Sequence, residues 1–304
     1  MTDFPEYRYL ATETLDEGRI ARIMFNRPET RNAQNRGMIV ELDDAFRVAE
    51  ADDDCRVVIL GGIGPVFSSG HDLGSKAAVA ERLGQPDEHP TYRTYGGSYF
   101  DGQSGEARYR QEWHFFLDNT LRWRNLRKVT ICQVQGPSYL ASMMVAWACD
   151  FITAAEDAEF ADMAATRFGN DHVEYFAHPW EFGIRRAKEL LMTGDAIGAE
   201  EAYRIGMVSR VFPTDQLTEL TLEFAKRISR LPSMTTLMIK EGVNETQDIQ
   251  GFTNALKAGF SLHHVMQQHW AELHEDHRAT AGAAEGFANW REIPLPGLAP
   301  KDKP

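Results

Sequence analysis

Residues 134–150 read VQGPSYLASMMVAWACD, a turn that runs directly into a long apolar segment. Gly136 and Pro137 are residue types that favour a turn, and Ser138 and Tyr139 keep this part polar. From residue 140 onward almost every residue is apolar or small, which is typical of a helix buried on all sides. The stretch therefore predicts a turn followed at once by a helix in the protein interior.

The segments on either side alternate between strands and helices. Upstream, the sequence predicts strands at 19–26, 57–62 and 128–136, and helices at 35–50 and 108–126. Downstream, it predicts a strand, a turn and a strand within 151–161, and helices at 172–192, 199–205, 214–230, 233–246 and 251–278. This order predicts an α/β core followed by a helical region.

The composition narrows the class of function. The chain has 304 residues, of which 43% are hydrophobic, and can bury a sizeable core. Its net charge of −13 argues against non-specific nucleic-acid binding, which needs a basic surface, but it permits a small anionic ligand. Only three cysteines occur, two of them in apolar runs, so we expect no disulfides and a cytoplasmic location. No apolar stretch reaches the ~18 residues that a membrane helix needs.

Four segments together carry a resemblance to a known family. They are NRPETRNA (26–33), VVILGGIGPVFSSGHDL (57–73), the stretch quoted first, and LLMTGDAIGAEEAYRIGMVSRVFP (190–213). In this order they resemble the enoyl-CoA hydratase/isomerase, or crotonase, superfamily. The resemblance implies an enzyme with a core of repeated ββα turns (1–200), a helical trimerisation region (201–290) and a tail (291–304) that we expect to be disordered. It also implies an acyl-CoA substrate, no cofactor other than the coenzyme A of that substrate, no metal, no membrane partner, and a homotrimer or homohexamer.

The shared chemistry of this family is an oxyanion hole made of two main-chain N–H groups that polarise the thioester carbonyl. By resemblance, the first donor falls on His71 and the second on Ala141, at the start of the predicted buried helix. Many relatives have three consecutive glycines where this chain has Leu140, Ala141 and Ser142. The positions that resemble the CoA-binding residues of the family are Arg31, Ala33, His71, Asp72, Leu73 and Ala141.

The acid/base residues depart from the family pattern. A typical hydratase has two glutamates, and the matching positions here hold Met144 and Ala164, neither of which can carry a proton. The tripeptide Gly169-Asn170-Asp171 resembles 4-chlorobenzoyl-CoA dehalogenases, in which its aspartate is the nucleophile. Asp171 is therefore the first candidate for a catalytic carboxylate and Asp162 the second. We expect isomerisation, C–C bond hydrolysis or substitution rather than standard hydration.

Several alternatives remain open at this point. Asp171 and Glu174 have the spacing of a capping box at a helix start, which is a structural role. His172 and His178 fit packing better than proton transfer, and the histidines between 263 and 277 match no metal-ligand pattern. The aromatic loop 89–105 is predicted to cover the acyl group. A CoA-independent β-diketone hydrolase and a non-catalytic acyl-CoA binding protein are the alternative functions.

Overall fold

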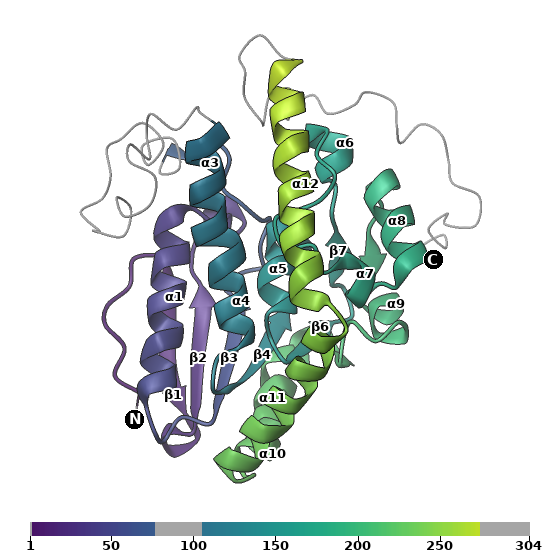
Figure 1. Cartoon of the computed structure of the whole chain (residues 1–304). Coiled ribbons are helices and arrows are strands. Elements are labelled where there is room, and N and C mark those ends of the chain that lie inside the picture. The colour runs from purple at the N-terminus through teal and green to yellow at the C-terminus, as the bar shows by residue number, and fades with distance from the viewer. Residues whose placement is uncertain (1, 77–104, 274–304) are drawn as a thin grey trace, which may run out of the picture.

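The computed structural model describes residues 2–76 and 105–273, and its centre is a six-stranded sheet. The strand order is β1 (Leu10–Leu15), β2 (Ile20–Phe25), β3 (Val57–Gly62), β4 (Val129–Val134), β6 (Phe151–Ala155) and β9 (Arg210–Phe212). The β1–β2 pair is antiparallel and every later pair is parallel. Because helices cover both faces of the parallel part, β3 and β4 are buried along their whole length (Figure 1).

A second, three-stranded sheet lies beside the first. It contains β5 (Pro137–Tyr139), β7 (Glu159–Ala161) and β8 (Ile197–Gly198), in the order β5–β7–β8. The turn quoted at the start of the sequence analysis forms β5, and α5 (Ala141–Trp147) follows it directly and is entirely buried. The predicted buried helix is therefore confirmed, whereas Pro137–Tyr139, predicted as part of a turn, form a strand of the second sheet.

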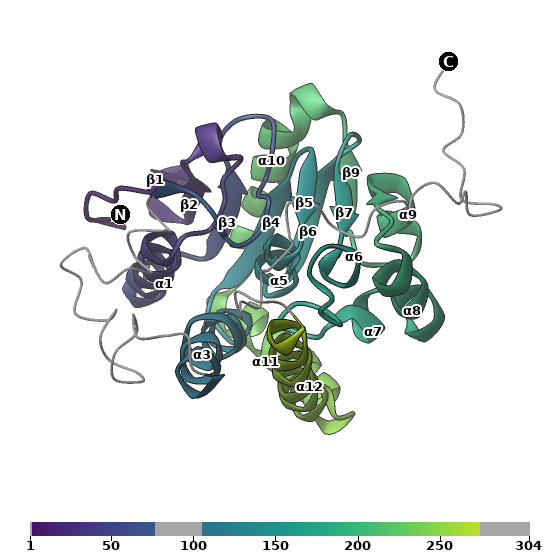
Figure 2. The same ribbon diagram turned by 90° about the horizontal axis from the view of Figure 1, so that it is seen from above.

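The remaining helices are α1 (Arg36–Ala51), α3 (Gly105–Glu112), a π-helical turn (Trp113–Asp118), α4 (Asn119–Arg124), α6 (Ala164–Phe168), α7 (His178–Glu181), α8 (Ile184–Thr193), α9 (Ala199–Arg204), α10 (Leu217–Ser229), α11 (Ser233–Ile249) and α12 (Phe252–Glu272). Short 3₁₀ turns occur at Asp16–Gly18, Pro28–Thr30 and Thr214–Gln216. Figure 2 shows α10 on the face of the large sheet opposite to α1, α3, α5 and α12. Ile59 packs towards α10, whereas its neighbours Val58 and Leu60 belong to the larger core on the other face.

The α/β fold with a helical C-terminal part is confirmed, but one predicted helix begins too early. Residues 171–177 have no helical structure, and helix starts only at His178, because buried side chains hold this segment in bends. Four strands, β1, β5, β8 and β9, were not predicted. The aromatic loop and the tail at 291–304 lie outside the described residues, apart from Gly105 at the start of α3. Among the described helices, none combines the length and the apolar character needed to cross a bilayer.

Candidate active site

Two loops of the chain meet at a point where each loop needs a glycine. A bridge between Ser68 and Ser138 aligns the loops, with the Tyr139 N–H donating to the Ser68 carbonyl at 3.2 Å. Gly136 (φ +53°) passes so close to Pro65 that a Cβ would lie 2.2 Å from its carbonyl oxygen. Gly70 (φ +86°) packs on the second loop, where a Cβ would lie 2.8 Å from the Tyr139 oxygen and 3.1 Å from the Ala141 nitrogen. A side chain at either glycine would separate the loops.

This close packing brings the two predicted donor amides together. Gln34 bonds in parallel register to both neighbours of His71, accepting from the Asp72 N–H and donating to the Gly70 carbonyl, so the His71 N–H points away from Gln34. Ala141 is the first residue of α5, and its N–H has no acceptor within the helix. Neither amide donates a hydrogen bond to any described residue. Both are therefore available to a ligand oxygen.

The turn before α5 keeps a glycine-like backbone without glycine. Leu140 has φ +55° and ψ −128°, a region that costs a non-glycine residue about 1–3 kcal/mol. Its N–H donates to the Ala161 carbonyl at 2.8 Å, and the Ser142 hydroxyl donates to the Tyr139 carbonyl at 2.8 Å. These bonds hold the turn in this conformation.

A narrow apolar pocket lies beside these amides. Its lining residues are Phe25, Gln34, Met38, Ile39, Leu42, His71, Phe115, Phe116, Thr120, Trp123, Ala141, Met144 and Val145. Met144 forms part of the wall at the position where, by resemblance, a hydratase has a catalytic glutamate, so this position offers no proton carrier. Such a lining suits a hydrocarbon chain attached to a polarised carbonyl.

The loop predicted to contact coenzyme A is anchored by a buried ion pair. Arg27 donates to the Asp72 carboxylate at 2.8 Å and to the Ala33 carbonyl, and both side chains of the pair are almost fully buried. Burial would raise the pKa of Asp72, but bonds from Ser75 and Arg27 outweigh it and hold that pKa below its ordinary value. Arg31 and Leu73 are exposed at the same edge, whereas Asp72 holds the loop in place.

Asp162 is a buried anchor, not part of the pocket wall. One of its oxygens accepts from the Ala164 N–H at 2.9 Å, and the other accepts from the Val173 N–H at 3.1 Å and lies 2.9 Å from His178 Nε2. Burial pushes the pKa of Asp162 upward, but the His178 and Ala164 bonds outweigh it and hold the pKa low. The second candidate of the sequence analysis thus fixes the loop 162–178 by its charge.

Asp171 is half-buried and also lies outside the lining of the pocket. Its carboxylate accepts from the His172 N–H at 3.0 Å and lies 3.8 Å from His263 Nδ1. Burial raises its pKa above the ordinary value. The alternative of a capping box is wrong, because no helix begins here and the Glu174 side chain turns towards His71 instead.

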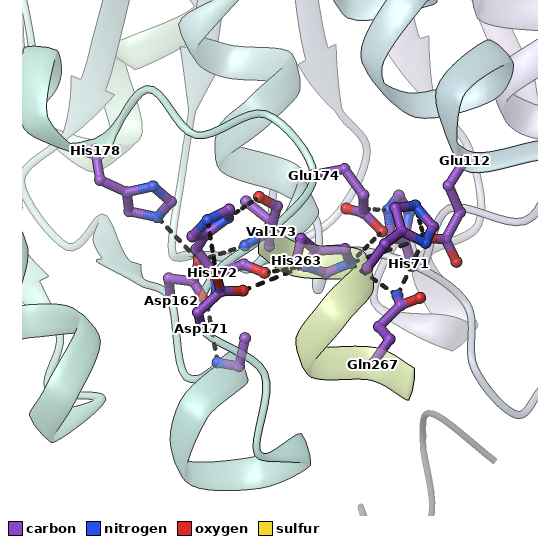
Figure 3. Close-up of polar contacts among 12 residues, drawn as sticks. His71, Glu112, Asp162, Asp171, His172, Val173, Glu174, His178, His263 and Gln267 are labelled. Carbon is purple, nitrogen blue, oxygen red and sulfur yellow. Dashed lines mark hydrogen bonds and ion pairs between the residues drawn. The ribbon is translucent and has the colours of Figure 1, made fainter. Parts of the chain in front are cut away.

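Buried Glu174 pairs with half-buried His71, which lines the pocket (Figure 3). His71 Nε2 lies 3.2 Å from the Glu174 carboxylate, and the His71 ring stacks on Phe116 with 3.8 Å between ring centroids. Burial would raise the pKa of Glu174, but the neighbouring His71 outweighs it and lowers that pKa to about 2. In the sequence, Glu174 was singled out only as the partner of Asp171 in a capping box.

Two further residues complete this cluster. The sequence analysis did not consider Glu112, and it considered His263 only as one of several histidines without a metal-ligand pattern. His263 of α12 lies 3.7 Å from Glu174, and its Nδ1 donates to the His172 carbonyl at 2.6 Å. Glu112 of α3 accepts from Gln267 at 3.1 Å, and burial together with the Glu174 charge raises its pKa to about 7. No local signal could have found them, because they come from helices about 60 to 150 residues apart in sequence.

Histidines and carboxylates of this cluster lie close enough to be considered as metal ligands. Within the described ranges, two groups have ligand atoms within 4.8 Å of one another: Asp171, His172 and His263, and Glu112, Glu174 and His263. Both groups depend on His263, whose Nδ1 already bonds to the His172 carbonyl and whose Nε2 lies 2.7 Å from Gln267. His172 is likewise bonded to a carbonyl through Nδ1. This donor set is organised for hydrogen bonds, and the absence of a metal stays a prediction.

Comparisons with known proteins agree on one family. The enoyl-CoA hydratase/isomerase family model matches residues 16–99 and 89–279. A Mycobacterium tuberculosis protein provisionally named enoyl-CoA hydratase EchA13 is 52% identical over 98% of this chain and 93% of its own. The 4-chlorobenzoyl coenzyme A dehalogenase-2 of an Arthrobacter species is 27% identical over 74% of this chain and 75% of its own. The crystal structure of a probable enoyl-CoA hydratase from Mycobacterium smegmatis matches with a TM-score of 0.77 and 37% identity, over 89% of this chain and 98% of the other.

Proposed function

Because the chain belongs to the enoyl-CoA hydratase/isomerase family and is an enzyme of that family, we propose that it acts on an acyl-CoA thioester through an oxyanion hole. The main-chain amides of His71 and Ala141 are its two donors. One observation carries this proposal: both amides lack an acceptor among the described residues and both residues line the same apolar pocket. The glycine contact at Gly70 holds the two loops together.

This arrangement fits the chemistry of a thioester. When a proton leaves the carbon next to the carbonyl, negative charge develops on the carbonyl oxygen, and two fixed N–H groups stabilise it without rearranging. Each such donor contributes about 3–4 kcal/mol to the stability of a transition state in enzymes where one was removed. The dipole of α5 adds to the effect at Ala141 because its positive end faces the same point.

The reaction is one that does not need two water-handling glutamates. Met144 and Ala164 cannot activate water, so standard syn-hydration has no acid/base pair here. Isomerisation, C–C bond cleavage or substitution at an activated acyl group all use the same oxyanion hole. Asp171 remains a candidate base or nucleophile because of the resemblance to the dehalogenases. Its position outside the pocket lining, however, favours a residue closer to the pocket in the role of base.

Coenzyme A would lie along the loop at residues 26–33 and 71–75. Arg31 is exposed there and is suited to a phosphate, and Leu73 is exposed for an apolar contact. Ala33 contributes its carbonyl to the Arg27 anchor, so its role is to shape the loop. We expect the anchor to set the loop position and the exposed residues to contact the ligand.

A panel of saturated, 2-enoyl, 3-enoyl and 3-oxo acyl-CoA thioesters tests the proposal by mass spectrometry and binding calorimetry. We expect binding and turnover of at least one thioester, without net addition of water as the main product. The same assay includes a CoA-free β-diketone. Turnover of the diketone with no affinity for any thioester would replace the proposal by a CoA-independent hydrolase.

The predicted homotrimer or homohexamer is part of this proposal. The described C-terminal helices expose apolar side chains, including Met234, Met238 and Val243 on α11. Such side chains are suited to contact with another copy of the chain. Sedimentation velocity at several protein concentrations would show a mass of three or six chains, and a monomer throughout would contradict this part.

A further inference from the structure

We propose that the imidazole of His71 is the proton carrier of this enzyme and that Glu174 positions it. The inference rests on the proposed function, because it places a proton-transfer step in the same pocket. It assigns one residue two tasks: the main-chain amide of His71 binds the carbonyl oxygen, and its side chain moves a proton. The substrate class is an unsaturated acyl thioester with an acidic allylic C–H bond.

The geometry of the His71 ring carries this inference. Its Nε2 lies 3.2 Å from the Glu174 carboxylate, and one ring face is stacked on Phe116. Its Nδ1 is buried and has no hydrogen-bond partner among the described residues, while the residue itself lines the pocket. A carboxylate that accepts from Nε2–H fixes the tautomer, and the lone pair is then on Nδ1. The pair therefore presents a base at the pocket wall.

The surroundings of Glu174 support a carboxylate that stays ionised. Its side chain is only 6% exposed, and its pKa is lowered to about 2 by the neighbouring His71 in spite of burial. The other groups that face the pair are Glu112 and Arg108 of α3, His263 and His264 of α12, and Arg36 of α1. Glu112 has a pKa of about 7, so at neutral pH it relieves part of the negative charge beside Glu174.

The step itself balances without a co-reactant. Nδ1 takes a proton from the allylic carbon, and the electron pair of that C–H bond moves through the chain to the thioester oxygen. The resulting dienolate is held by the amides of His71 and Ala141. The imidazolium then returns the proton to the other end of the allylic unit, and the double bond has moved. No water, metal or leaving group takes part, which suits a pocket whose lining is almost entirely apolar.

The location of the base explains how it reaches the reacting carbon. The donor amide and the ring belong to the same residue, so a carbonyl oxygen held at the amide places the adjoining carbons beside the ring. Asp171 has no such position, because its carboxylate accepts from the His172 amide and His263 lies between it and Glu174 (Figure 3). His71 is thus a catalytic residue in this proposal and Glu174 a positioning residue.

The test measures proton exchange instead of net turnover. Wild-type enzyme is incubated in D₂O with a saturated acyl-CoA and with a 3-enoyl-CoA, and NMR follows deuterium entry next to the carbonyl and movement of the double bond. His71→Gln keeps the main-chain amide and removes the base, so exchange should fall about 100-fold or more while acyl-CoA affinity stays near wild type. The matched control is His269→Gln, the same substitution at an exposed histidine of α12, which should exchange at the wild-type rate. Asp171→Asn tests the other candidate base.

A pH profile separates positioning from simple structural support. Glu174→Gln removes the charge that stabilises the protonated ring, so the acidic limb of the exchange profile should move to lower pH, and the limiting rate should fall. A merely structural role would lower the rate without moving the limb. This variant also keeps the inference falsifiable should His71→Gln fail to fold.

The outcomes distinguish the inference from the proposed function. Wild-type exchange in His71→Gln, or an unmoved limb in Glu174→Gln, would overturn the inference and leave the oxyanion hole in place. Loss of exchange in Asp171→Asn alone would show that Asp171, and not His71, carries the proton. A wild-type enzyme that binds no acyl-CoA would overturn the proposed function itself.

Discussion

The turn that leads into α5 and the loop 162–178 form two halves of one site, and they are built in opposite ways. The turn is a main-chain device, in which Gly70 and Gly136 let two loops touch and the reactive groups are N–H bonds. The loop has little regular structure and is held by buried charged side chains, above all Asp162 with His178. The oxyanion hole can therefore form with many different side chains at its two positions, because its donors are main-chain N–H groups, whereas proton transfer depends on particular side chains.

Breaking the main-chain half should have the largest effect. In Gly70→Ala a Cβ would lie 2.8 Å from the Tyr139 oxygen and 3.1 Å from the Ala141 nitrogen, so the loops must separate. We expect turnover to fall about 100- to 1,000-fold, the loss seen when one oxyanion donor is removed. Steady-state kinetics, with a thioester of the panel that the wild-type enzyme turns over, measures this fall.

Gly206→Ala is the matched control for that variant. Gly206 has φ +89°, close to the +86° of Gly70, but a Cβ there meets nothing within 4 Å. The control carries the same backbone strain, about 1 kcal/mol, without the crowding. Equal losses of turnover in the two variants would mean that strain, and not the approach of the amides, explains the effect.

Breaking the side-chain half should reduce stability by a few kcal/mol. Asp162→Asn replaces one acceptor oxygen by an NH₂ group and leaves His178 and the Val173 N–H without their charged partner. Removing one member of a buried pair costs about 3–5 kcal/mol, and the loss should appear in urea unfolding at pH 7. Because the folded-state pKa of Asp162 is lowered, its contribution is present at neutral pH and lost as the pH falls through that pKa. An unfolding free energy equal to wild type would show that the loop does not depend on this charge.

Substitution of Glu112 should have a smaller effect on the free energy of unfolding, and one that increases it. Glu112 has a pKa raised to about 7 by burial and by Glu174, so its contribution to stability is present below its unfolded-state pKa and lost as the pH rises through 7. Gln in place of Glu112 has no proton to lose, so the Glu112→Gln variant keeps the stability that the wild type loses when Glu112 ionises. Relative to wild type, the variant should gain about 1–3 kcal/mol of unfolding free energy between pH 5 and pH 8. A difference independent of pH would contradict the raised pKa.

The same contrast explains what the sequence could predict. The buried helix and strand 57–62 could be predicted because apolar runs have local meaning. The two donor positions came from the resemblance to the family. The fold expected from the resemblance is supported by the match to the Mycobacterium smegmatis structure.

The side-chain half could not be predicted in the same way. Asp171 and Glu174 have the spacing of a cap, but burial of Asp162 and His178 keeps residues 171–177 out of a helix and turns Glu174 towards His71. Glu112 and His263 join the cluster only after α3 and α12 pack together. Such contacts depend on tertiary packing, which a single sequence does not encode in any local pattern.

The central claim is that the amides of His71 and Ala141 polarise a thioester carbonyl. Difference infrared spectroscopy of an acyl-CoA labelled with ¹³C at the carbonyl, bound to wild-type enzyme, tests it most directly. The account predicts that the carbonyl stretch moves to lower frequency on binding and that most of this shift is lost in Gly70→Ala. A bound thioester whose carbonyl frequency equals that in water, or a shift that Gly70→Ala leaves intact, would contradict it.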